Sequence, residues 1–183
     1  MHSKECFDAS KSLLRRKLVK NTFEYYYFQH LSGFPIRQAI EIRIKDALGI
    51  DFISESNGAT IPIVAQEFID LFRDNRCNFP VKISYVNKIN SWSQYFIHAG
   101  FSTYIWQIEW AHYILQPLFN PYRDEFGYNM YGTVSYTKSF ASEIEKKVKE
   151  ITSKKSGIDY NDIIIHFKNP AARIVEDPSG NQY

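Results

Sequence analysis

The stretch FPIRQAIEIRIKDALGI, residues 34–50, decides the fold class of this 183-residue chain. Its apolar residues recur at the spacing that gives an α-helix one buried face. Proline suits the first turn of a helix and glycine its C-terminal end, so Pro35 and Gly49 predict a helix over residues 35–48. Gly33 and Pro35 also indicate a turn before that helix. The apolar residues on its predicted face are Ile36, Ile40, Ile44, Ala47 and Leu48.

Helical patterns extend on both sides of this stretch. We expect an earlier helix over residues 4–30, and later helices from Thr60 to before Asn78, over 81–98 and over 103–119. The helix over 103–119 carries Trp106, Trp110, Ile114 and Leu118 at helical spacing. The sequence therefore predicts a mainly α protein, whose residues 1–120 form an antiparallel bundle of about five helices.

The composition changes after residue 120. The Gly- and Tyr-rich segment 126–136 indicates a strand or an ordered loop. Ser139 and Glu143 resemble a capping pair at the start of a helix over 139–155. The runs IIIHF and ARIV then flank Lys168, Asn169 and Pro170, a pattern typical of a β-hairpin. We expect residues 121–183 to form a small C-terminal α+β appendage packed on the same domain.

The composition is that of a globular protein, with 44% hydrophobic and 23% charged residues. Aromatic residues reach 16%, which fits core packing alone, the commoner explanation, or a well-packed core together with an interface or groove. The net charge of +2 is low for a dedicated nucleic-acid domain. Lysines and arginines gather within residues 11–20 and 146–155, where a solvated helix face is a commoner explanation than phosphate contact.

Several classes of site are disfavoured because their motifs are missing from the sequence. The chain has no Gly-rich phosphate loop, no G-x-S-x-G elbow and no H-E-x-x-H zinc motif, and Cys6 and Cys77 form no zinc pattern. Glu109 and His112 have the spacing of a di-iron ligand pair, but the remaining ligands are missing. We expect no metal and no cofactor. Residues 1–12 are polar and no apolar run approaches about 18 residues, so we also expect no membrane contact and a cytoplasmic, reducing location.

A polar stripe along the helix over 81–98 is the strongest candidate for chemistry. Asn90, Gln94 and His98 lie on one face with Ser91 beside them, and His98 ends the helix just before Gly100. The dipole at a helix C-terminus favours a protonated imidazole, so His98 is suited to donate a proton near neutral pH. The alternative is that these side chains only form hydrogen bonds across a helix contact.

The helix over 35–48 adds charged residues that this stripe lacks. Arg37 and Arg43 border its apolar face, and Glu41 lies one turn from Arg37. If the two helices pack together, these side chains meet His98. Arginine then binds a phosphate and the histidine moves a proton, while Asn90, Ser91 and Gln94 contact the substrate.

Residues 34–50 and the later stretch INSWSQYFIHAGFSTYIW, residues 89–106, resemble HEPN domains, the higher eukaryotes and prokaryotes nucleotide-binding family. The resemblance extends over residues 4–119. It implies a metal-independent ribonuclease with an arginine, four to six further residues and then a histidine, in a homodimer whose two motifs face each other. It also implies a role in bacterial defence, such as a toxin–antitoxin, abortive-infection or CRISPR system.

His98 matches the motif histidine of that family, but Ser91, Trp92 and Ser93 stand where its arginine would. In one interpretation Arg37 or Arg43 supplies the charge, Glu41 matches the acidic residue that orients it, and His98 acts as general acid or base. In the other, the chain is an inactive relative that binds RNA. Two further alternatives are a module that binds a protein through its C-terminal region, and a nucleotide sensor.

Overall fold

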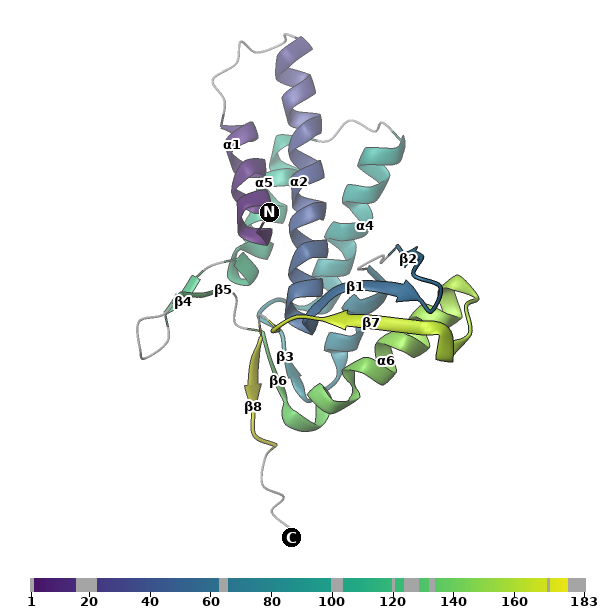
Figure 1. The fold of residues 1–183 in the computed structure, drawn as a ribbon. Helices are drawn as coiled ribbons and strands as arrows, with labels where there is room; N and C mark the ends of the chain where they lie inside the picture. The colour runs from purple at the N-terminus through teal and green to yellow at the C-terminus, as the bar shows by residue number, and fades with distance from the viewer. Residues whose placement is uncertain are drawn as a thin grey trace.

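The computed structural model describes residues 2–15, 23–62, 66–99, 104–119, 121–123, 129–131, 134–170 and 172–177, with only the backbone described at 23–30, 95–99, 121–123 and 129–131. The protein is mainly α-helical, as predicted (Figure 1). The helices are α1 (Ser3–Leu14), α2 (Phe23–Leu48), α3 (Gln66–Ile69), α4 (Ile83–Ala99), α5 (Ile105–Phe119) and α6 (Lys138–Ser156), with 3-10 turns η1 (Asp70–Arg73) and η2 (Tyr160–Asp162).

The long helix α2 corrects two predictions about the N-terminal part of the chain. The helix expected over 4–30 is wrong, because α1 ends at Leu14 and α2 begins at Phe23. The turn expected at Gly33 and Pro35 is also wrong, since α2 continues through both residues. Proline inside a helix removes one backbone hydrogen bond. The deep burial of the apolar face that follows Pro35 offsets this cost.

The first sheet joins segments that are far apart in the sequence. Its strands β1 (Ile50–Glu55), β2 (Thr60–Ile61) and β7 (Ile163–Phe167) lie in the order β2-β1-β7, and both pairings are antiparallel. Thr60 therefore lies in a strand, so the predicted start of the third helix is wrong, and α3 and η1 are the helical segments within its range. Gly49 makes the sharp change from α2 into β1 with a φ of 70°, so its predicted place at the end of the helix is confirmed.

The second sheet has the order β3-β6-β8, from β3 (Cys77–Asn78), β6 (Ser135–Thr137) and β8 (Arg173–Val175). Because β7 pairs with β1 and β8 pairs in parallel with β6, the hairpin predicted from IIIHF and ARIV is wrong. Strands β4 (Pro121–Arg123) and β5 (Asn129–Tyr131) form a separate antiparallel pair. Both three-stranded sheets thus combine strands from either side of residue 120.

The predicted helices over 81–98, 103–119 and 139–155 are confirmed as α4, α5 and α6. The cap of α6 differs from the prediction, because Thr137 rather than Ser139 accepts the backbone N–H of Phe140. Helices α1, α2, α4 and α5 lie at one end of the molecule, and α6 lies with the sheets at the other (Figure 1).

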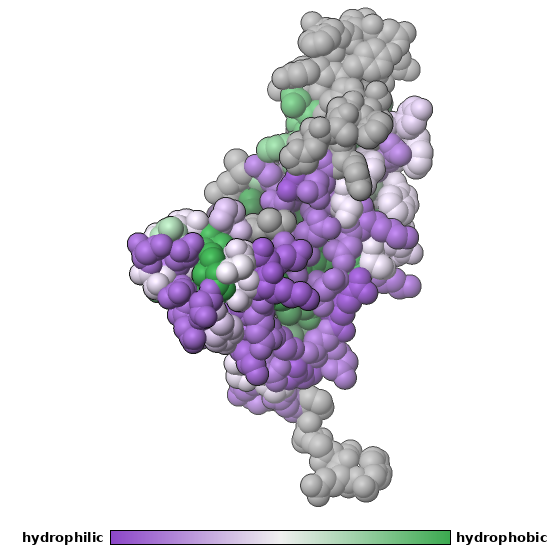
Figure 2. Space-filling model, turned by 90° about the vertical axis from the view of Figure 1, so that its right-hand side faces the viewer, coloured by the Kyte–Doolittle hydropathy of each residue, from purple (hydrophilic) through white to green (hydrophobic). Residues whose placement is uncertain are grey.

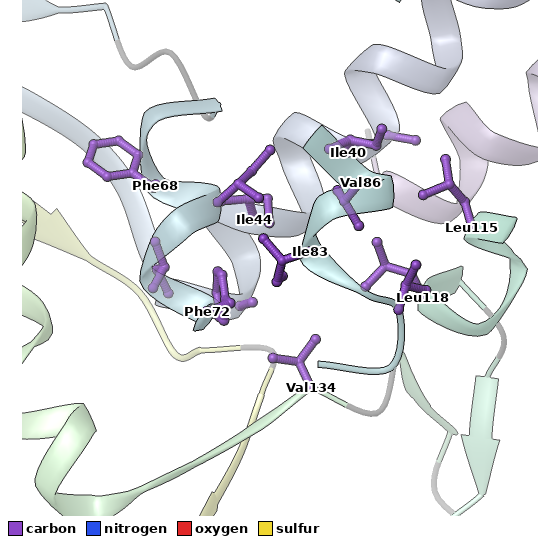
Figure 3. Packing of buried hydrophobic residues seen from close by; sticks show 14 of the residues in the cluster. Ile40, Ile44, Phe68, Phe72, Ile83, Val86, Leu115, Leu118 and Val134 are labelled. Atoms are coloured by element: carbon purple, nitrogen blue, oxygen red, sulfur yellow. The ribbon is translucent and has the colours of Figure 1, made fainter. Parts of the chain in front are cut away.

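A continuous hydrophobic core joins the two ends of the molecule. Ile40 and Ile44 of α2 pack near Val86 and Ile83 of α4, and Val134 contributes from just before β6 (Figure 3). Much of the surface in Figure 2 is hydrophilic, with a compact hydrophobic area exposed on it. Within the described residues, no helix is long and apolar enough to span a membrane.

Candidate functional site

The charged residues predicted on α2 lie in two different environments. The Nε atom of Arg37 donates to Oε1 of Glu41 at 2.8 Å, and this ion pair is partly buried. Arg43 lies in the core, where burial lowers its pKa to about 10 against an opposing effect of Asp46. The structure therefore brings Arg37 and Glu41 together, whereas Arg43 is enclosed by protein and presents no surface to a phosphate.

The polar stripe of α4 faces α3 rather than an open groove. The amide of Asn90 is buried and donates to Gln66 at 3.4 Å, and Gln66 donates in turn to the hydroxyl of Ser91 at 3.2 Å. The Oδ1 atom of Asn90 is buried without a hydrogen-bond partner among the described residues. Gln94 is partly exposed. Two of the three predicted substrate contacts thus join α4 to α3, through a glutamine that the sequence did not single out.

His98 lies in the last turn of α4, and its side chain falls outside the described residues. The levels of the helices can still be compared, because Ile40 lies near Val86 and Ile44 near Ile83 (Figure 3). The C-terminal end of α4 lies at the same end of the molecule as the N-terminal half of α2 (Figure 1), so His98 is closer in level to Arg37 than to Arg43, which lies six residues, roughly 9 Å, further along α2. The partly exposed ion pair of Arg37 and Glu41 is therefore closer to His98 than Arg43 is.

A groove between α4 and α5 is lined by all three tryptophans of the chain. Trp92 comes from α4, and Trp106 and Trp110 come from successive turns of α5. The side chains of Trp106 and Trp110 are 62% and 47% exposed, large fractions for indole rings. The groove has a volume of about 240 Å³, and its lining is completed by Lys88, Ile89, Gln107 and Ala111. We call this surface the tryptophan groove.

The tryptophan groove exists because the buried face of α5 excludes Trp106 and Trp110. Ile108, Ala111 and Leu115 pack into the core, which turns Trp106 and Trp110 outward. The ring of Tyr85 contacts Trp110 edge-on, with 6.4 Å between the centroids, and supports its position. The side chain of Gln107 accepts the backbone N–H of Tyr104 at 3.0 Å and fixes the start of α5.

The chemistry of the tryptophan groove suits a flat aromatic ligand that carries negative charge. Indole faces stack on planar rings, and exposed aromatic clusters mark binding surfaces. Lys88 is exposed and is the one charged side chain in the lining. An aromatic cage for a cation would be opposed by this ammonium group, whereas a phosphate would be attracted by it.

A cluster of charges between the loop after η1 and α6 is satisfied within the protein. Arg76 donates to Asp74 and to Glu143, at 2.8 Å in each case, and Lys147 donates to Asp74 at 3.0 Å. The hydrogen bonds from Arg76 lower the pKa of Glu143 to about 2 and hold the pKa of Asp74 well below its usual range. Because these charges compensate one another, we interpret the cluster as an ion-pair network that anchors α6. Glu143 belongs to this network and does not cap the helix.

The remaining histidines and cysteines form no metal site in the part of the chain described. Glu109 is exposed and His112 is buried, so this pair points in different directions and forms no ligand set. Cys6 and Cys77 are free thiols, and burial raises the pKa of Cys77 to about 12. Comparison of the chain with protein-family models, with characterised proteins and with solved structures gives no match.

Proposed function

We propose that this protein binds single-stranded RNA, and that the RNA bases stack in the tryptophan groove. The observation that carries the proposal is the convergence of Trp92, Trp106 and Trp110 on one partly open surface beside an exposed lysine. Proteins that bind single strands combine aromatic platforms for the bases with cationic side chains for the backbone. The low net charge of the chain fits a short binding surface better than an extended electrostatic one.

The rival partner for these tryptophans is another protein, because aromatic residues are also enriched at protein interfaces. Two observations favour RNA. The groove, at about 240 Å³, is smaller than a pocket for a drug-sized molecule and suits one or two planar rings. Lys88 at its border also provides the positive charge that a nucleotide requires and that a buried apolar helix does not.

The proposal includes the HEPN-like assignment, in which residues 1–120 form an antiparallel bundle of about five helices that dimerises. Its support is the order of α2 and α4, which contain residues 34–48 of the first stretch and residues 89–99 of the second. Metal-independent cleavage of RNA by His98 is a prediction within this assignment, as are a role in bacterial defence and a cytoplasmic location. Trp92 and His98 lie on the same helix, separated by roughly 9 Å along its axis and by about 120° around it, so an RNA strand that contacts both must pass around α4.

The decisive experiment uses the intrinsic fluorescence of the protein. Because all three tryptophans line the groove, their combined emission reports on this surface. Titration with short single-stranded RNA oligonucleotides is expected to quench the emission in a saturable way, and a duplex of the same sequence is expected to quench it less. Trp110→Ala is expected to weaken binding by about 1–3 kcal/mol, roughly 5- to 150-fold, if one base stacks on that ring.

Tyr113 provides the matched control, because it is 75% exposed on α5 and does not line the groove. Tyr113→Ala should bind RNA as the unmodified protein does, which fluorescence anisotropy of labelled RNA measures without relying on the tryptophans. Equal loss of affinity in both variants would show that general aromatic exposure, and not the groove, determines binding. An absence of RNA binding in the unmodified protein would refute the proposal.

A further inference from the structure

Strand β7 is an edge strand with an unusually apolar sequence. Its residues, IIIHF, pair on one side with β1, and in the described part of the chain no strand pairs with its other side. Three large apolar side chains are exposed at this place, Ile164 and Phe167 on β7 and Phe52 on β1. Edge strands of this kind template pairing with another strand unless charges or prolines protect them, and β7 contains neither (Figure 1).

The ladder between β1 and β7 shows which backbone groups of β7 point outward. Ser56 donates its N–H to the carbonyl of Asp162, so Asp162 and every second residue after it direct their N–H and C=O groups toward β1. Lys168, which donates its N–H to Gly49, fits the same alternation. The backbone groups of Ile163, Ile165 and Phe167 therefore point away from the sheet.

These outward groups match a second copy of the same strand. An antiparallel pair with a two-fold axis at Ile165 places Ile165 opposite Ile165 of the other copy and Ile163 opposite Phe167, so that all three outward residues exchange backbone hydrogen bonds. The charges match as well, because Asp162 then lies opposite Lys168 of the other copy. Lys168 contacts Asp46 at 2.8 Å and remains partly exposed, and Asp162 accepts the hydroxyl of Ser56, so neither is enclosed.

The outer face of the sheet supports the same register. The rings of Phe52 and His166 stack there, with their centroids 3.8 Å apart, and Ile164 is 43% exposed beside them. In the two-fold register Ile164 of one copy lies next to His166 of the other, which joins two apolar surfaces into one. We propose that β7 pairs with β7 of a second copy of this chain and extends the sheet across a homodimer. This interface is separate from the one through which the helical bundle is proposed to dimerise, and the inference does not depend on RNA binding.

Sedimentation velocity over a range of protein concentrations tests the proposal. The unmodified protein is expected to dimerise, and Ile164→Lys is expected to raise the dimer dissociation constant by about tenfold or more, because a lysine on an edge strand opposes pairing. Ile174→Lys on β8 is the matched control, since Ile174 is 45% exposed and lies outside this edge; it should dimerise normally.

A cysteine at the proposed axis tests the register separately. Residues that face each other as a hydrogen-bonded pair have Cα atoms about 5.5 Å apart, within the range that a disulfide spans. Ile165→Cys should therefore form a covalent dimer on oxidation, whereas Ile164→Cys, whose partner is His166, should not. A protein that is monomeric at every concentration would overturn the proposal. The candidate partner of the β7 edge would then be a peptide of another protein. A dimer that Ile164→Lys does not weaken and that Ile165→Cys does not cross-link would also overturn it.

Discussion

The imidazole Nε2 atom of His112 lies 2.9 Å from the hydroxyl oxygen of Ser10, and both side chains are buried. The Ser10 hydroxyl donates to the backbone carbonyl of Ser32 at 2.5 Å. Because that hydroxyl has one proton, the Nε2 atom of His112 carries the hydrogen that Ser10 accepts. This short chain of hydrogen bonds ties α1, α2 and α5 together inside an otherwise apolar region, where the ring of His112 also contacts Phe7 edge-on.

Replacing Ser10 by alanine should destabilise the fold. The substitution removes the hydroxyl that accepts the imidazole N–H of His112, and a buried polar group that loses its partner costs about 1–3 kcal/mol. Urea denaturation should show a loss of this size in the free energy of unfolding. Ser12→Ala is the control, because Ser12 is exposed and its hydroxyl bonds only to the backbone of Asp8. Equal losses in the two variants would contradict the importance of the buried network.

The stability of the protein should fall as the pH is lowered from about 7 to about 4. Burial lowers the pKa of His112 from 6.5 to about 4, so between these values the unfolded chain binds the proton and the folded chain does not. The free energy of unfolding then decreases with falling pH, by at most about 3 kcal/mol from this group, and the effect ends below the folded pKa. Denaturation of His112→Gln at pH 7 and pH 5 should show a smaller difference than the unmodified protein does. An identical difference would assign the pH dependence to other groups.

Helices α4, α5 and α6 could be predicted from the sequence because each combines a periodic apolar pattern with local stop signals. Helix α2 was divided wrongly, because Pro35 is a local signal against a helix while the burial that outweighs it is a property of the whole fold. The pairing of β1 with β7 was missed for a related reason. An apolar run such as IIIHF indicates a strand, but it does not say which strand it will pair with.

The candidate site shows the same division between local and tertiary information. Spacing placed Arg37 and Glu41 one helical turn apart, and they form an ion pair. The same spacing did not show that Arg43 is enclosed or that Gln66 binds the polar stripe, since both follow from how helices pack. The tryptophan groove was missed because tryptophans at helical spacing normally indicate a buried face. The clue available in the sequence was the aromatic surplus, which fits a groove but is explained more often by core packing alone.

Gly49→Ala should destabilise the protein more than Gly58→Ala. Both glycines have a positive φ, 70° and 88°, so either alanine is strained by roughly 1–2 kcal/mol. At Gly49 a Cβ atom would also lie 2.7 Å from the carbonyl oxygen of Lys168, whereas the space at Gly58 is open. Backbone must then move where α2 enters β1, so thermal or urea denaturation should rank Gly49→Ala as the less stable variant. A reversed order of stability would show that the backbone carbonyl of Lys168 can move at little cost in free energy.

His98→Ala should abolish the proposed RNA cleavage without loss of the fold. The expected reaction is independent of metal, so a chelator should leave the rate of the unmodified protein unchanged. Circular dichroism checks that α4 still forms, and binding of RNA in the tryptophan groove should persist in the variant. Undiminished cleavage by His98→Ala would remove this histidine from the mechanism.

Lys88→Ala should change the salt dependence of RNA binding in a defined way. If the Lys88 ammonium contacts one phosphate, its removal lowers the slope of the logarithm of affinity against the logarithm of salt concentration by about 0.7. Affinity should fall at low salt and converge with that of the unmodified protein as the salt concentration rises. Lys82→Ala removes an equally positive charge from an exposed position outside the lining, so its slope should stay unchanged. Parallel slopes for all three proteins would show that RNA approaches the tryptophans without using Lys88.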